Sequence, residues 1–283
     1  MPQLTQIRQK IKSIVTTKKI THAVRLVSMS MYSRLEKQKN NLQNYTNNLF
    51  QLFNYAKAHN TEWKNKILMP RDILDSKPLL IIVSTTKGLC GSLNANLFKY
   101  IQKTLILENH QKPEIITVGL KSQKFIPELN LPKSTKVILS FNEIGSSNYL
   151  SLTQEIIKII YDTKKNYSSV VFFSTKIKNF FAQTPHKTTI IPTSAQTEET
   201  KIKDLMFTEN SQKIIDSLAK AYIKSSISDL LFDAILSEQA ARFLAMDSAT
   251  NNADNYLEQL TLQYNKTRQA LITREVSELS SSL

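Results

Sequence analysis

The chain has 283 residues, and its 37 Lys and Arg residues exceed its 23 Asp and Glu residues, so the formal net charge is +14. Such a balance favours an acidic partner, which would be nucleic acid, an anionic membrane surface or an acidic protein. The single cysteine, Cys90, excludes an internal disulfide and a Cys-rich metal site. No apolar run is long enough to cross a membrane, and no spacing typical of metal ligands is present.

Glycine and proline divide the chain. All four glycines lie between Gly88 and Gly145, and seven of the eight prolines lie between Pro70 and Pro192. Both ends are therefore free of helix breakers, whereas the middle is rich in turn signals. This distribution predicts three parts: an N-terminal coiled-coil helix (1–69), a central α/β domain (70–192) and a C-terminal region that is mostly a second coiled-coil helix (193–283).

Apolar residues recur in steps of three and four from Leu4 to Leu52, with a slip between Lys18 and His22 where a bend or a change of partner face is plausible. A similar stripe runs from Met246 to Tyr264. A single helix of roughly 55–65 residues in this N-terminal part would reach about 80–100 Å, so it must pair or project. Since the two long helices flank the central domain, they should form an antiparallel, left-handed coiled coil.

The central part alternates strand and helix patterns. Residues 79–85 form a continuous apolar run, as expected of a strand that is covered on both faces. The other expected strands are 114–118, 136–141, 170–174 and, at an edge, 188–191, and the expected helices are 93–108 and 149–165. The alternation predicts a three-layer, Rossmann-like α/β domain with a mostly parallel sheet.

The turn from Thr86 to Ser92 lies where a phosphate-binding loop would lie, between a strand and a helix. Its spacing matches neither known glycine-rich phosphate motif, so a tight strand-to-helix turn, which explains both glycines, is the better interpretation. Cys90 lacks a neighbouring base in the sequence, and no paired carboxylates are present. The sequence therefore favours a protein without catalytic residues, metal or cofactor.

Charge is concentrated near the N-terminus. Residues 1–40 carry a single acid, Glu36, and nine bases: Arg8, Lys10, Lys12, Lys18, Lys19, Arg25, Arg34, Lys37 and Lys39. This face is either a solvated helix surface or a surface for an acidic protein, and no aromatic platform accompanies it for nucleic acid. Near the other terminus, Arg268, Gln269 and Thr273 lie within about one helical turn, either exposed to solvent or bonded to a partner.

Three sequence blocks resemble one family. They are I-R-Q-K-I-K-S-I with K-K-I-T-H-A-V (from Ile7 and from Lys18), G-L-C-G-S-L-N from Gly88, and E-Q-A-A-R onward from Glu238. Together they cover essentially the whole chain and resemble the gamma subunit of the F-type ATP synthase, the central rotor shaft. The resemblance implies a non-catalytic subunit that couples proton- or sodium-driven rotation of the membrane c-ring to ATP synthesis or hydrolysis in the alpha/beta ring.

The implied partners are the alpha, beta and epsilon subunits and the c-ring, without nucleic acid. The implied location is peripheral, on the cytoplasmic face of a bacterial inner membrane or the matrix face of an organelle membrane. Residue by residue, the resemblance implies beta-subunit contacts for Arg268, Gln269, Thr273 and Val24. It implies that a basic face meets acidic beta loops (Arg8, Lys10, Lys12, Lys18, Lys19 and Arg25) and that Glu209 meets the c-ring.

Asp247 departs from the family pattern, in which a lysine is common at this position. Two other classes of function remain open on the sequence: a coiled-coil adaptor whose α/β domain binds a nucleotide or anion, and a nucleic-acid-binding protein suggested only by the net charge.

Overall fold

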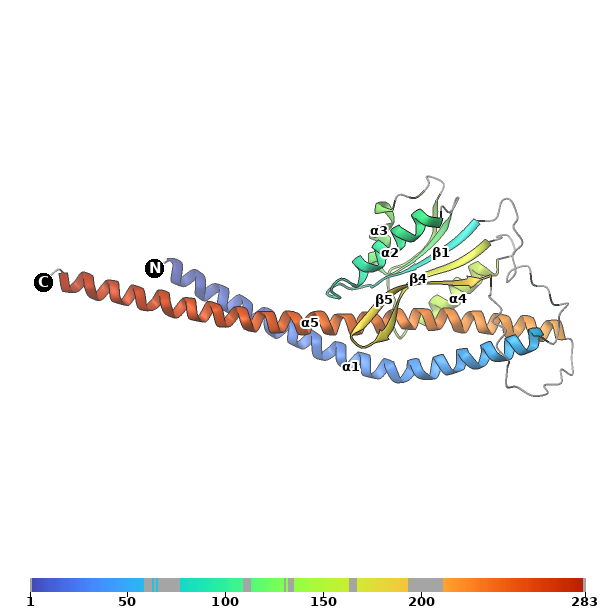
Figure 1. The fold of residues 1–283 in the computed structure, drawn as a ribbon, viewed down its shortest axis with the longest axis horizontal. Helices are drawn as coiled ribbons and strands as arrows, with labels where there is room; N and C mark the ends of the chain where they lie inside the picture. The colour runs from blue at the N-terminus through green and yellow to red at the C-terminus, as the bar shows by residue number, and fades with distance from the viewer. Residues whose placement is uncertain are drawn as a thin grey trace. The chain divides into compact units, whose positions relative to one another are not determined.

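The computed structural model describes residues 2–58, 63, 65, 77–108, 113–129, 131, 135–162, 167–192 and 211–281 (Figure 1). The chain forms two compact units. The helical unit contains Met1–Ser30 and Arg242–Leu283, and the sheet unit contains Met31–Ala241. The helices are α1 (Pro2–Ala58), α2 (Leu93–Glu108), α3 (Leu120–Phe125), the 3-10 turn η1 (Ile126–Glu128), α4 (Tyr149–Ile160) and α5 (Ser211–Ser281).

Five strands form one mixed sheet in the sheet unit, in the order β3-β2-β1-β4-β5. They are β1 (Lys77–Val83), β2 (Glu114–Val118), β3 (Lys136–Phe141), β4 (Tyr167–Asn179) and β5 (Ala182–Ile191). The first four strands are parallel, and only β4 and β5 pair antiparallel. The predicted α/β class, with a mostly parallel sheet and long terminal helices, is confirmed.

The continuous apolar run of β1 is explained by burial on both faces, because alternate side chains of a strand point to opposite sides. Leu79 and Ile81 belong to one core cluster, and Leu80 and Ile82 belong to another. Helices α2 and α3 cover the second cluster, whereas α4 and α5 cover the first (Figure 1). Helix α5 therefore supplies part of the core of the sheet through one stripe of residues: Ile215, Ala219, Ile223, Ile227, Leu231 and Ala234.

Three elements differ from the prediction in particular: β4, β5 and α3. The fourth strand continues to Asn179, and the fifth begins at Ala182, so the two form a long hairpin. Polar residues such as Lys176 and Lys178 hid this extension, because strand propensity depends on pairing partners as much as on side chains. The short helix α3 was also not predicted. It follows Gly119, whose φ of 92° and whose contact with Ser84 leave no room for a side chain.

Helix α1 continues through Lys18–His22, where the sequence allowed a bend. In the sheet unit, α1 and α5 pack through Tyr32 and Leu35 against Phe232 and Leu236. The hydroxyl groups of Thr46 and Ser225 lie 2.6 Å apart across the same pair of helices.

Candidate functional site

The helical unit carries most of the residues expected to bind partners. As the residue number rises along α1, that of its contact on α5 falls, so the two helices run antiparallel here. The contacts that show this are Lys18 with Asp254, Thr21 with Thr250, and Arg25 with Asp247. The buried residues of the unit mix apolar and polar side chains: Ile7, Thr21, Ser28, Arg242, Met246, Thr250 and Leu260.

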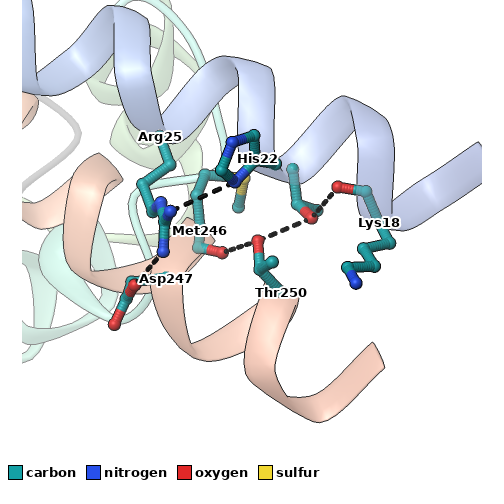
Figure 2. Close-up of polar contacts among 7 residues, drawn as sticks. Lys18, His22, Arg25, Met246, Asp247 and Thr250 are labelled. Atoms are coloured by element: carbon teal, nitrogen blue, oxygen red, sulfur yellow. Dashed lines mark hydrogen bonds and ion pairs between the residues drawn. The ribbon is translucent and has the colours of Figure 1, made fainter. Parts of the chain in front are cut away.

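The centre of this pairing is polar (Figure 2). The Thr21 hydroxyl donates to the backbone carbonyl of Lys18 (3.0 Å) and lies 2.9 Å from the Thr250 hydroxyl. The Thr250 hydroxyl also lies 2.7 Å from the carbonyl of Met246, so its one proton serves two acceptors. Both threonines are buried, and the helices are therefore joined here by a hydrogen bond instead of an apolar contact.

An ion pair flanks this hydrogen bond on each side. Lys18 pairs with Asp254, and the Arg25 Nη1 lies 2.6 Å from the Asp247 Oδ1. The second Arg25 nitrogen, Nη2, lies 3.1 Å from the His22 Nδ1. We call the six residues that link the two helices the polar clasp: Lys18, Thr21, Arg25, Asp247, Thr250 and Asp254. All of its cations come from α1, and all of its acids come from α5.

The residues of the predicted basic face fall into two groups, those paired within the clasp and those exposed to solvent. Lys18 and Arg25 are partly buried and paired with acids of the same chain. Arg8, Lys10, Lys12 and Lys19 are exposed. The structure also accounts for Asp247, which departs from the family pattern, since it supplies the counter-charge of Arg25. This pairing could not be seen in the sequence, because 222 positions separate the two residues.

The free end of α5 is exposed. Arg268, Gln269 and Thr273 all face solvent, and the Thr273 hydroxyl donates to the Gln269 carbonyl (2.9 Å) of its own helix. Every residue from Ile272 to Ser281 is exposed. The large apolar side chains among them follow helical steps of four and three, and they are Ile272 (50% exposed), Val276 (59%) and Leu279 (68%). This stripe was not among the predicted contact residues, although its helical spacing is visible in the sequence.

The other expected contact residues lie elsewhere. Val24, on α1, is half-buried. Glu209, expected at the c-ring, lies outside the described residues, so the structure says nothing of its surroundings. The predicted site residues of α1 and those near Arg268 therefore belong to the same unit, but they are spread along its helices and do not converge on a pocket.

The turn between β1 and α2 is closed by its own polar groups. Asn94 accepts from the Thr85 amide (3.2 Å) and donates to the Thr85 hydroxyl (2.7 Å). Cys90 is buried against Leu93 of α2 and Ala241 of α5. The polar groups of Thr85 and Asn94 are thereby used within the turn itself, which fits a tight strand-to-helix turn.

Only one of the two glycines in that turn is required. Gly91 has a φ of 56°, in the left-handed region that favours glycine. The other left-handed residue of the turn is Leu89, with a φ of 66°, and not Gly88. A side chain at Gly88 would meet open space. The turn therefore accounts for Gly91 by its backbone conformation, whereas neither a positive φ nor a close contact accounts for Gly88.

The described parts of the chain contain no group of three His, Cys, Asp or Glu residues that could hold a metal ion. In the same parts, no helix combines the length and apolar character that a membrane span requires.

A second charged contact joins α1 to α5 in the sheet unit. The Lys39 Nζ lies 2.7 Å from the Asp229 Oδ1 and 2.8 Å from the Asp233 Oδ1. Burial raises the pKa of Asp233, and Lys39 opposes that shift. Lys176 and His186, on the neighbouring hairpin, interact electrostatically with Asp233, and burial together with the charge of Lys176 lowers the pKa of His186.

Comparison with known proteins gives a consistent result. The family model described as ATP synthase matches residues 3–283. The chain is 34% identical to the ATP synthase gamma chain of Buchnera aphidicola subsp. Schizaphis graminum, with 99% of this chain and 97% of the relative covered. It is 30% identical to the ATP synthase gamma chain of Cupriavidus metallidurans, with 98% and 97% covered.

The fold is also similar to solved structures. A chain in the cryo-EM structure of the Euglena gracilis mitochondrial ATP synthase, OSCP/F1/c-ring, has a TM-score of 0.68 at 15% identity, with 99% of this chain and 93% of that chain covered. A chain of the rotor of the same synthase has a TM-score of 0.63 at 14% identity, with 96% and 99% covered. At these identities the likeness concerns the fold.

Proposed function

Because the chain belongs to the ATP synthase gamma chain family, we infer that it is the central-stalk subunit of an F-type ATP synthase. In this role it turns with the c-ring and couples ion-driven rotation to ATP synthesis or hydrolysis in the alpha/beta ring. Coupling of this kind requires that the stalk contact each catalytic site differently as it turns, which is a differential interaction between two states of a site.

The observation that carries the proposal is the uncovered end of α5. An isolated helix is marginally stable in water, and this one exposes Ile272, Val276 and Leu279 on one stripe. Such a stripe would pack well against a partner surface, and the sleeve of an alpha/beta ring would supply one. Arg268 and Gln269, exposed less than two turns away, would donate hydrogen bonds to a beta-subunit loop, with Thr273 as a further contact.

The exposed part of the basic face would meet acidic loops of the same beta subunits. We assign this role to Arg8, Lys10, Lys12 and Lys19, which are exposed. Val24 would contribute a small apolar contact beside them. Glu209 would meet the c-ring, with the epsilon subunit alongside.

We further propose that the chain has no catalytic role of its own. The closed turn at Thr85 and Asn94 and the packing of Cys90 support this proposal. Its association with the membrane would be indirect, through the c-ring. The bacterial relatives favour the cytoplasmic face of an inner membrane over the matrix face of an organelle membrane.

Co-expression with the alpha and beta subunits of the same source tests the proposal. We expect gel filtration to give one large complex with one copy of this chain for every three alpha–beta pairs, and we expect its ATPase activity to fall when the chain is omitted. Isothermal titration of the isolated chain with ATP should give no binding. A chain that elutes alone, beside alpha and beta subunits that are fully active without it, would refute the stalk role.

A further inference from the structure

We propose that the polar clasp sets the register of α1 against α5 in the helical unit, so that Lys18 and Arg25 are positioning residues inside the chain. This inference rests on the contacts of the clasp and does not depend on the proposed function.

On α1, the large apolar side chains near the clasp are mostly exposed, and Met246 of α5 is a large apolar side chain that is buried beside it. Ile20, Leu26 and Val27 are 57%, 54% and 57% exposed, whereas the buried residues of this stretch of α1 are Thr21 and Ser28. Apolar packing is not directional, and a seam in which Met246 is flanked by small polar side chains offers few knobs that would resist sliding. Polar contacts are directional, so they can select one alignment of the two helices.

The spacing of the clasp supports this role. The two bases are seven positions apart on α1, and their acids, Asp247 and Asp254, are seven positions apart on α5. If either helix slid by one heptad, at most one ion pair could form again. The same slide would separate Thr21 from Thr250 and leave buried hydroxyl groups to find new partners, which is unfavourable. The native register is the one that satisfies all three contacts.

The exposure of the ion pairs also fits a role in specificity. The Lys18 and Asp254 side chains are 39% and 48% exposed, and those of Arg25 and Asp247 are 24% and 38% exposed. Pairs this accessible add little to overall stability. The best-attested use of polar groups in helix pairing is to select register and orientation.

A disulfide reporter can measure register in the full-length chain. The variant Thr21→Cys/Thr250→Cys reports the native alignment, since the two hydroxyl oxygens lie 2.9 Å apart. The variant Thr21→Cys/Leu257→Cys reports an alignment shifted by one heptad. The fraction cross-linked in a glutathione buffer is read on non-reducing gels, and single-cysteine variants control for the buried Cys90.

The charges are then reversed in both reporters. We expect Lys18→Asp/Arg25→Asp to lower native cross-linking by about fivefold or more, as two lost ion pairs that become repulsive would do. Adding Asp247→Arg/Asp254→Lys should restore it to within about twofold of the parent. The matched control is Lys12→Asp/Lys19→Asp, which makes the same change of charge at exposed positions with the same spacing. We expect it to leave cross-linking unchanged.

Two outcomes would overturn the proposal. Native cross-linking that survives the reversal would show that the ion pairs do not set the register. Cross-linking that falls on reversal and is not restored by the swap, in a chain with unchanged helix content by circular dichroism, would show that complementarity of charge is not the cause. If the variant with all four substitutions fails to fold, the single pair can be tested instead. Arg25→Asp should then lower native cross-linking, and Arg25→Asp/Asp247→Arg should restore it.

Discussion

The ammonium group of Lys39, on α1, lies 2.8 Å from a carboxylate oxygen of Asp233, on α5, and both side chains are buried. Asp229 lies 2.7 Å from the same ammonium group. Lys39 is therefore the cation that two acids of α5 share in the sheet unit. Buried charges are costly to leave unpaired, so this lysine should matter more for stability than the exposed lysines around it.

Replacing Lys39 should destabilise the sheet unit. We expect Lys39→Met to lower the free energy of unfolding by about 3–5 kcal/mol, because it leaves the Asp229 and Asp233 carboxylates without their cation. The exposed Lys37 on the same helix provides the control, and Lys37→Met should change the value by less than about 0.5 kcal/mol. Urea unfolding followed by circular dichroism measures both. Equal effects of the two substitutions would contradict the assigned role of Lys39.

The sheet unit should lose stability at alkaline pH. Burial and the hydrogen bond to Glu36 raise the pKa of Tyr32 from 10.0 to about 12, and burial raises the pKa of Tyr161 to about 12 as well. The folded chain then holds protons that the unfolded chain releases above pH 10, so stability falls as the pH rises from 10 toward 12.

Urea midpoints measured across this range test the effect. Tyr32→Phe should reduce the loss of stability between pH 10 and 12, because Phe has no proton to lose. Tyr45→Phe, at an exposed position, should leave the dependence of stability on pH unchanged. A Tyr32→Phe chain with the same alkaline slope as the parent would show that this hydroxyl is not responsible.

Two glycines should respond oppositely to alanine. At Gly119 a side-chain carbon would lie 2.3 Å from the Ser84 backbone oxygen at a φ of 92°, so Gly119→Ala should cost at least about 2 kcal/mol of folding free energy. At Gly88 the same carbon meets open space, so Gly88→Ala should be neutral or stabilising by up to about 1 kcal/mol. Thermal unfolding of the pair of variants decides the matter, and a costly Gly88→Ala would contradict the geometry of the turn.

Arg268 and Gln269 should matter only in the complex. We expect Arg268→Ala/Gln269→Ala to weaken assembly with alpha and beta subunits, or the ATPase activity of the assembly, by about tenfold or more, as the loss of hydrogen bonds to a charged group would do. The isolated variant should keep its helix content, because both side chains are exposed. Lys213→Ala, exposed on α5 in the sheet unit, is the control. Unchanged assembly and turnover in the double variant would remove these residues from the partner surface.

Much of the fold could be predicted because its signals are local. The expected bounds of α2, β2 and β3 agree with the structure, since each begins or ends at a glycine, a proline or a change of hydrophobic period. The β4–β5 hairpin was underestimated because its outer half is polar and is held by cross-strand hydrogen bonds. The contribution of α5 to the core of the sheet could not be predicted either. The spacing of Ile215 and Ile223 fits a coiled-coil seam as well as it fits packing against a sheet.

The candidate site shows the same division. Periodicity and the absence of breakers were enough to establish two long helices, and the free polar residues near Arg268 could be picked out on one of them. Neither periodicity nor the absence of helix breakers reveals which basic residues are paired with acids of the same chain. Lys18 and Arg25 differ from Lys12 and Lys19 only through acids more than 200 positions away in the chain, at Asp254 and Asp247. Helix propensity acts between near neighbours, whereas charge pairing depends on distances that exist only after the helices have packed, so the tertiary structure alone decided which charges remain for a partner.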